Sequence, residues 1–161
     1  MQLSPLAPLT YPDLPPIAGV RLAVAQAGVR YKNRTDVALA ELAEGTNVAG
    51  VFTRSLTASA PVLACRESLK SGRARALVVN SGNANAFTGS VGVASVARVA
   101  QVCARTIGCE AAQVFTASTG VIGERLPDDK ITAALAGLHH NLSPGAWEQA
   151  ARAIMTTDTY P

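Results

Sequence analysis

The segment RALVVNSGNANAFTG, residues 75–89, decides the class of fold that the sequence predicts. It begins with a short apolar run, Arg75–Asn80, typical of a buried central strand, and continues into a polar loop rich in asparagine and glycine. A long apolar stretch follows at Val91–Thr106 and has the length of a helix, which Gly108 ends because glycine readily adopts the left-handed conformation of a C-cap. A strand, a polar loop and a long helix in succession indicate a mixed α/β fold in which helices cover a sheet.

Three strands are expected on the N-terminal side of this segment. Residues 19–28 alternate larger apolar with smaller or polar side chains, the period of a half-buried strand. Asp36–Leu42 is compatible with a strand or a helix, and we favour a strand because its valine and first leucine alternate. Asn47–Thr53 is rich in β-branched and aromatic residues and therefore predicts a third strand. Three strands in sequence suggest an antiparallel meander.

Further helices and one further strand are expected around and after the central segment. Ser59 is placed to cap a helix that ends near Leu69. A strand is predicted at Gln113–Ala117, followed by the turn STGVIG at residues 118–123. Two C-terminal helices are predicted at Pro127–His139 and at Pro144–Met155, the latter with Ser143 as its N-cap.

The chain divides into an arm and one domain. Residues 1–16 contain five prolines, which prevent a helix, so a proline-rich extended arm is expected there. Residues 17–161 are expected to form one α/β domain. The chain is 48% apolar but only 4% aromatic, so its core should consist mainly of small aliphatic side chains.

Composition excludes several classes of function. The net charge of +3 comes from scattered lysine and arginine residues, so a nucleic-acid partner is not expected. Every long uncharged stretch is interrupted by polar residues, so no membrane span is expected. Cys65, Cys103 and Cys109 lack the spacing of a metal site and are expected to be reduced, buried side chains. With no signal peptide in the first residues, these features predict a cytoplasmic protein.

Two strand-to-loop junctions, Val78–Gly89 and Ala117–Gly123, are the segments most suited to chemistry. Unpaired backbone N–H groups in such loops can face an anion or a developing negative charge. Asn80 and Asn83 add neutral donors and acceptors. Asparagine and glycine are equally typical of turns with positive φ, so the residues alone leave both interpretations open.

Thr119 and Gly120 form the most specific pair within these junctions. A threonine hydroxyl beside a glycine N–H supplies two donors for one oxygen, which is what a tetrahedral acyl-transfer intermediate requires. The chain contains no Gly-x-Ser-x-Gly elbow and no phosphate-binding P-loop. His139 and His140 are adjacent at the end of a predicted helix, where they suit its dipole better than a role as base or ligand. The sequence therefore predicts oxyanion donors without an activated nucleophile.

Five segments occur in an order and spacing that resemble one family. They are AGVFTRS at residues 49–55, APVLACRESL at 60–69, ALVVNSGNANAFTG at 76–89, STGVIGERLP at 118–127 and AIMTTDT at 153–159. Together they resemble the α-chain region of the bifunctional glutamate N-acetyltransferase/ornithine acetyltransferase family of arginine biosynthesis. Phe87 departs from the pattern, because many relatives have cysteine there.

The resemblance implies a fold and a reaction. The fold would be a layered sandwich of sheet and helices of the self-processing ornithine acetyltransferase/aminopeptidase type, similar to N-terminal-nucleophile hydrolases. The precursor would cut itself at an Ala–Thr bond, and the freed threonine of the β chain would carry acetyl from N-acetylornithine to glutamate. This sequence stops at Pro161, before that bond, so a truncated α chain is expected. An α2β2 assembly is implied, with no metal or bound cofactor, and some members also accept acetyl-CoA.

The resemblance also implies roles for single residues. Thr119 and Gly120 would form the oxyanion hole. Thr156 would contact the amino-acid substrate, with its neighbour Thr157 as the alternative. The residues that would shape the floor of the pocket are Asn80, Gly82 and Asn83.

Two other functions stay open on the sequence. One is a self-processing, aminopeptidase-like hydrolase with the same architecture. The other is a nonenzymatic module that binds a small ligand, using SGNANAFTG as a phosphate cradle. That loop lacks a lysine and the GxGxxG spacing, which makes the third function the weakest.

Overall fold

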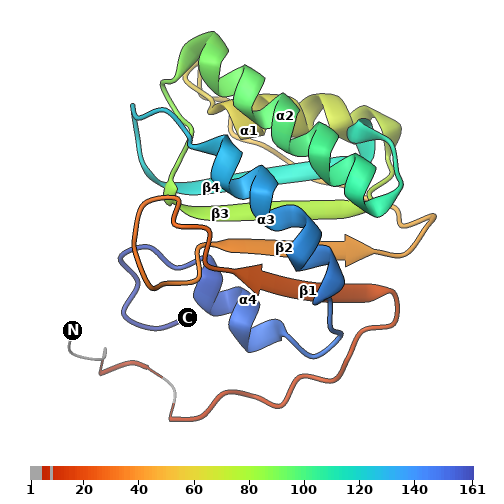
Figure 1. Ribbon diagram of the computed structural model, residues 1–161, viewed down its shortest axis with the longest axis vertical. Helices are drawn as coiled ribbons and strands as arrows, with labels where there is room; N and C mark the ends of the chain where they lie inside the picture. The colour runs from red at the N-terminus through yellow and green to blue at the C-terminus, as the bar shows by residue number, and fades with distance from the viewer. Residues whose placement is uncertain (1–4, 8) are drawn as a thin grey trace.

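The computed structural model describes residues 5–7 and 9–161, which form one sheet with helices on both faces (Figure 1). The strands lie side by side in chain order: β1 (Val20–Ala25), β2 (Val37–Leu42), β3 (Ala76–Asn83) and β4 (Val114–Val121). The α-helices are α1 (Ala60–Ser68), α2 (Gly89–Ile107), α3 (Asp128–His140) and α4 (Trp147–Ala153). Two short 3₁₀ helices, η1 (Leu69–Ser71) and η2 (Ala111–Gln113), precede β3 and β4.

The sheet is mixed, and its parallel half places the site. β1 and β2 are antiparallel, with Val20 opposite Leu42, and β2 and β3 are antiparallel as well. β3 and β4 are parallel, with α2 as the crossover between them. The carboxyl ends of β3 and β4 therefore meet at the same edge of the sheet, and the loops that follow them lie together.

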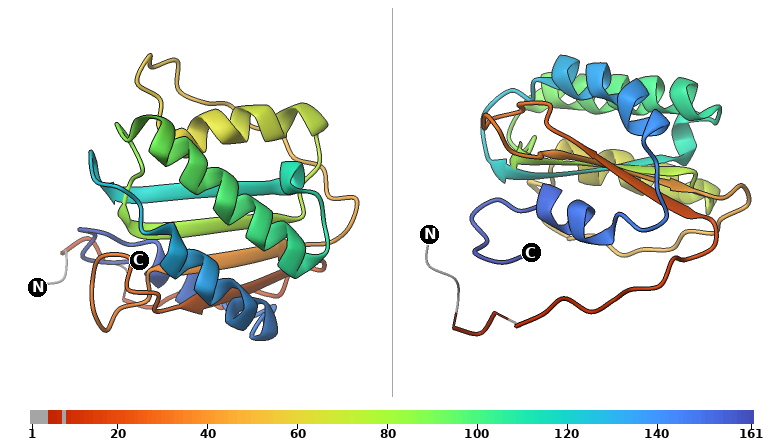
Figure 2. Two further views of the ribbon diagram at one scale, coloured as in Figure 1. Left: turned by 45° about the horizontal axis from the view of Figure 1, so that its top comes forward. Right: turned by 60° about the horizontal axis from the view of Figure 1, so that its bottom comes forward.

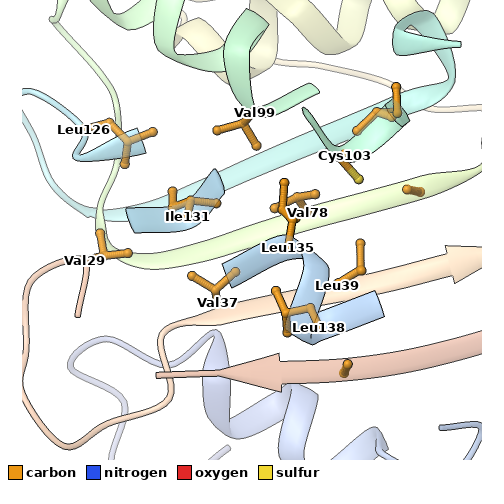
Figure 3. Close-up of a cluster of buried hydrophobic side chains, with 14 residues drawn as sticks. Val29, Val37, Leu39, Val78, Val99, Cys103, Leu126, Ile131, Leu135 and Leu138 are labelled. Atoms are coloured by element: carbon orange, nitrogen blue, oxygen red, sulfur yellow. The ribbon is translucent and has the colours of Figure 1, made fainter. Parts of the chain in front are cut away.

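The hydrophobic core lies between the sheet and the pair α2 and α3 (Figure 3). Leu39 from β2 packs there with Ile131 and Leu135 from α3, all of them at most 1% exposed. Each such burial contributes about 1.5–3 kcal/mol relative to an exposed side chain. Alanine and valine fill most of the remaining positions, as the composition predicts. α4 covers the opposite face of the sheet, against β1 and β2, and α1 packs along β4 (Figure 2).

Most predicted elements are confirmed, but the strand predicted at Asn47–Thr53 is wrong. Only Asn47 pairs there, through a single bridge to Arg73, and Val51 is 97% exposed. β-branched residues favour a strand only where a neighbouring strand and a packed face are available. β3 occupies the position beside β2 instead, so it is the third strand of the antiparallel part.

The two predicted serine caps have different outcomes. Ser59 lies at the N-cap of α1, but its side chain makes no capping hydrogen bond. The predicted cap at Ser143 is wrong, since its backbone exchanges two hydrogen bonds with Leu22, at 2.8 and 2.9 Å. This pairing holds the chain in an extended bridge beside β1, so α4 begins only at Trp147.

The remaining global predictions concern the arm, the cysteines and metal or membrane binding. The described part of residues 1–16 contains no helix or strand, and residues 1–4 and 8 lie outside the described residues. Cys65 and Cys103 are buried, whereas Cys109 is partly exposed. Among the described residues, no three His, Cys, Asp or Glu side chains group as metal ligands do. No helix in this part of the chain has the length and apolar character needed to cross a membrane.

Candidate functional site

The two segments singled out in the sequence are neighbours in the sheet. Asn80 lies opposite Ser118, Ser81 opposite Thr119 and Gly82 opposite Gly120. The predicted turn at residues 118–123 is therefore wrong in its first half, because β4 continues to Val121. The extension forms because β3 also continues past its apolar run, to Asn83, and offers a partner for each residue of β4.

Gly120 is the residue that lets the two strand ends approach each other. Its φ of +132° disfavours an L side chain, and a Cβ there would meet the Gly82 carbonyl carbon at 2.4 Å and the Asn83 nitrogen at 2.6 Å. The Gly82 side of the pair is equally tight, since a Cβ on Gly82 would lie 2.9 Å from Cβ of Arg30. Gly120 is thus required by close packing against the backbone of β3, and Gly82 by close packing against the side chain of Arg30.

The donors of Thr119 and Gly120 can face away from β3. The Val121 carbonyl accepts a hydrogen bond from the Ala84 N–H at 2.8 Å, so Val121 points its backbone groups toward β3. Residues alternate in a parallel ladder, which turns the N–H of Gly120 toward the free side of this edge strand. The Thr119 hydroxyl has no hydrogen-bond partner within the described part of the chain. A hydroxyl and an N–H on adjacent residues are thus both available as donors at this edge of the sheet.

Buried asparagines hold these strand ends in place. Ser118 Oγ donates to Asn80 Oδ1 at 2.6 Å, and Asn80 Nδ2 donates to the Asn83 carbonyl at 2.9 Å. Asn83 Nδ2 donates to the carbonyls of Glu124 at 3.1 Å and Arg125 at 3.3 Å, in the loop after β4. Asn80 and Asn83 are each only 3% exposed. Their amides are thus committed to protein backbone and side chains.

A third asparagine, Asn85, fixes the start of α2. It is fully buried with a φ of +47°, and its Nδ2 donates to the Gly92 carbonyl at 3.1 Å. Its Oδ1 accepts from the Thr88 hydroxyl at 2.8 Å. A Cβ on Gly92 would lie 1.9 Å from the Thr88 hydroxyl oxygen, so glycine is required for this contact. The sequence signal for this role of Asn85 was the group of asparagines that precedes a helix with glycines in its first turn.

A cavity of about 500 Å³ brings Thr119 and Thr156 together. Thr156 belongs to the irregular segment after α4, far from Thr119 in the chain. Residues of β3, β4, α4 and this segment line the cavity, among them Val79, Ile154, Met155 and Asp158. Gly120, Thr157 and the three pocket-shaping residues Asn80, Gly82 and Asn83 are not in its lining. Of the predicted site residues, the cavity thus joins the predicted oxyanion donor Thr119 with the predicted substrate contact Thr156.

The segment after α4 is shaped by hydrogen bonds that the sequence analysis missed. The fully buried Ser81 donates from Oγ to the carbonyl of Ala153, the last residue of α4, at 2.8 Å. The backbone N–H of Thr156 donates to Asp158 Oδ2 at 2.8 Å, and this hydrogen bond lowers the pKa of Asp158. A serine that follows the apolar run of the strand, between Asn80 and Gly82, was the available signal for Ser81.

Several titratable groups of the domain lie outside the cavity of Thr119. Burial raises the pKa of the Cys103 thiol to about 12, so it stays protonated at neutral pH. Arg98 donates to Asp128 at 2.6 Å and lowers its pKa, with a further contribution from Ser95 at 2.9 Å. His139 lies at the C-terminus of α3, as predicted, 3.9 Å from Glu41. Neither His139 nor its neighbour His140 lines the cavity of Thr119.

Comparisons with known proteins agree on one family. The ArgJ family model matches residues 21–161. The chain is 60% identical over 159 residues to the arginine biosynthesis bifunctional protein ArgJ of Bradyrhizobium diazoefficiens and 57% identical to that of Mesorhizobium japonicum. Each alignment covers 99% of this chain, but the chain spans only 38% of the length of either relative.

Two solved structures share the fold. Ornithine acetyltransferase of Mycobacterium tuberculosis, solved in complex with ornithine, is 40% identical with a TM-score of 0.85, over 91% of this chain and 79% of the other. The ArgJ protein of Bacillus halodurans is 32% identical with a TM-score of 0.80, over 88% of this chain and 74% of the other. These matches confirm the predicted fold class of layered sheet and helices.

Proposed function

Since this chain belongs to the ArgJ family, we propose that it is the α-chain part of an acetyltransferase that moves acetyl from N-acetylornithine to glutamate. The observation that carries this proposal is the cavity at the end of β4, which Thr119 and Thr156 both line. It supplies an oxyanion donor and a candidate substrate contact on one surface. The ornithine complex of the Mycobacterium tuberculosis relative supports the class of substrate.

The proposed nucleophile is the N-terminal threonine of a second chain, the β chain, released from the same precursor. The lengths of the relatives support this division: this chain spans 38% of the curated ArgJ proteins but 79% of the solved Mycobacterium tuberculosis chain. The solved chain is therefore much shorter than a whole curated relative. The domain boundary between residues 16 and 17 stays a prediction.

Thr119 and Gly120 act when negative charge develops on the acetyl oxygen. The β-chain threonine oxygen attacks the acetyl carbon, its proton passes to the threonine's own α-amino group, and a tetrahedral oxyanion forms. The Thr119 hydroxyl and the Gly120 N–H donate to that oxyanion. The C–N bond then breaks, the proton goes to the departing amine, and ornithine leaves. The amine of glutamate attacks the acetyl ester in the same way and regenerates the threonine.

The remaining parts of the proposal follow the family. No metal or bound cofactor takes part, and acetyl-CoA would serve only as an alternative acetyl donor. Thr156 contacts the amino-acid part of the substrate, with Thr157 as the alternative, and Asn80, Gly82 and Asn83 shape the site from beneath the strand ends. We place the enzyme in the cytoplasm as an assembly of two α and two β chains.

The test uses the complete gene product with N-acetylornithine and glutamate. We expect Thr119→Ala to lower kcat by roughly 10²–10³ with little change in KM, because a transition-state donor is lost. Thr119→Ser keeps the hydroxyl and is the matched control, with near-normal kcat expected. Mass spectrometry of the purified enzyme should show a second chain that begins with threonine. An unchanged kcat in Thr119→Ala refutes the role of Thr119.

The same material separates the proposal from a hydrolase of this architecture. Release of amino acids from peptides, without transfer of acetyl to glutamate, would identify an aminopeptidase-like enzyme and reject the acetyltransferase. The substrates are mixed in one assay with wild-type enzyme, so the two activities are compared directly.

A further inference from the structure

The loop between β1 and β2, residues 26–36, is bonded both to the C-terminal segment that contains Thr156 and to the chain that follows β4. It connects two antiparallel strands at the edge of the sheet far from the β4 edge, yet it extends beside the chain end that follows α4 (Figure 1). The hydrogen bonds and ion pairs of this β1–β2 loop join the C-terminal segment to the loop between β4 and α3. None of its residues lines the cavity itself.

A buried carboxylate gives the β1–β2 loop its shape. Asp36 is fully buried, and its two carboxylate oxygens accept the backbone N–H groups of Ala27 at 2.7 Å and Val29 at 2.6 Å. The Asp36 backbone bonds both ways across the sheet, to the Ala25 carbonyl at 3.0 Å and from the Ser81 N–H at 2.9 Å. Charge-assisted bonds to backbone N–H groups are strong, so the base of the loop is held firmly.

Arg34 extends from this rigid base to the C-terminal segment. Its Nη1 donates to the Thr156 carbonyl at 3.1 Å, and its Nη2 donates to the carbonyl of Met155. The guanidinium carbon also lies 5.2 Å from the centre of the Tyr31 ring, which limits its motion. A planar guanidinium can hold two adjacent carbonyls at once, whereas an ammonium group is a single point of charge. Arg34 therefore fixes the backbone at the residue that contacts the cavity.

The other side of the β1–β2 loop is tied to the connection that follows β4 and to the first turn of α3. Arg30 Nη1 pairs with Glu124 Oε2 at 2.6 Å, and Lys130 Nζ donates to the Gly28 carbonyl at 2.6 Å. Gly82 packs so closely against Arg30 that a Cβ on Gly82 would not fit. The same loop thus bonds to the chain after Thr119 and to the backbone of Thr156.

We propose that Arg34 is a positioning residue of the acyl-transfer site and that the β1–β2 loop sets the spacing between Thr119 and Thr156. This inference rests on the proposed function, because it assigns Thr156 to the amino-acid substrate. α4 does not depend on Arg34, since Ser81 holds the carbonyl of Ala153 independently. Loss of Arg34 therefore loosens the segment from Met155 to Asp158 and leaves the rest of the fold in place.

The experiment compares Arg34→Ala, Arg34→Lys and a surface control, Arg21→Ala, in the complete gene product. Arg21 pairs with Glu41 on β2 and is half exposed. Arg21→Ala therefore removes one positive charge, as Arg34→Ala does, but no hydrogen bond to the segment from Met155 to Asp158. We expect Arg34→Ala to raise KM for N-acetylornithine and glutamate about 10- to 100-fold, the range for losing charge-assisted hydrogen bonds, with a smaller change in kcat. Arg34→Lys should recover only part of this loss.

Two further readouts separate positioning from general destabilisation. Millimolar guanidinium ion should lower KM of Arg34→Ala and leave Arg21→Ala unchanged, and hydrogen exchange should speed up at residues 155–158 but not in α4. An unchanged KM in Arg34→Ala overturns the inference. So does a fall of kcat in Arg34→Ala that is as large as the rise in KM and is not rescued by guanidinium. Absence of acetyl transfer in the wild-type enzyme overturns the proposed function instead, and the hydrogen-exchange comparison still tests the tie between Arg34 and this segment.

Discussion

Replacing Gly120 by alanine tests whether the ends of β3 and β4 are joined as closely as the structure shows. Two costs add at this position. A positive φ outside the usual left-handed region costs an alanine about 1–3 kcal/mol. The new Cβ would also lie 2.4 Å from the backbone of Gly82. Since backbone cannot rotate away as a side chain can, the strands must separate, and overpacking of this kind costs about 1–3 kcal/mol more.

Gly123 provides a matched control three residues further along. Its φ is +84°, and a Cβ there would meet nothing within 4 Å. Gly123→Ala therefore carries a backbone cost of about 1–2 kcal/mol but no steric cost. Both substitutions reduce the freedom of the unfolded chain equally, so that effect cancels in the comparison. We expect Gly120→Ala to lose about 2 kcal/mol more free energy of unfolding than Gly123→Ala.

The measurement is urea unfolding of the complete gene product, followed by circular dichroism, together with the acetyl-transfer assay. Gly120→Ala should shift the unfolding midpoint to lower urea and abolish transfer at temperatures where it is still folded. Gly123→Ala should stay active. If both variants lose the same free energy of unfolding, Gly120 does not lie in close contact with β3. The inference that this contact aligns the oxyanion donors is then wrong as well.

Two further predictions concern titratable groups. The Arg98 hydrogen bond lowers the pKa of Asp128 below its unfolded value, so the pair stabilises the fold above about pH 4 and loses this effect as the pH falls through the folded pKa. Asp128→Asn should therefore cost about 1–2 kcal/mol at pH 7, and this cost should shrink steadily as the pH is lowered below about 4, measured by urea unfolding over a pH series. The Cys103 thiol has a pKa of about 12 and no exposed surface, whereas Cys109 is partly exposed. We therefore expect Cys103 to react with iodoacetamide far more slowly than Cys109. Equal rates of reaction at about pH 8 would contradict the burial of Cys103.

Local patterns were sufficient for the elements whose neighbours are close in the sequence. The apolar run of β3 and the long helix α2 lie where Arg75–Asn80 and Val91–Thr106 predict them, and Gly108 ends α2 in the left-handed conformation. The strand prediction at Asn47–Thr53 was wrong because β-branched residues indicate only a preference for a pleated surface. The surface it would need beside β2 is taken by β3, a competition that no local window contains.

The site was predictable only in part, for a related reason. A role for Thr119 was predicted from its chemistry and a role for Thr156 from resemblance, but the cavity they share depends on how the segment after α4 folds back onto β3. That return is directed by Ser81 and Arg34, whose roles appear only when distant backbone carbonyls are in reach. Likewise, β4 extends past Ala117 because the glycines of two strands happen to lie opposite each other.

The buried polar groups under the strand ends are neutral amides, and this bears on the chemistry proposed above them. Asn83 can donate to the carbonyls of Glu124 and Arg125 while its Oδ1 accepts the N–H of Asn85 at 2.8 Å. A carboxylate of the same shape has no donor for those carbonyls. It would also place a buried negative charge at the end of β3, where it would oppose an oxyanion developing at the neighbouring end of β4. An amide satisfies the backbone without that penalty, so the network can tie the loops together without adding a net charge beside the reaction.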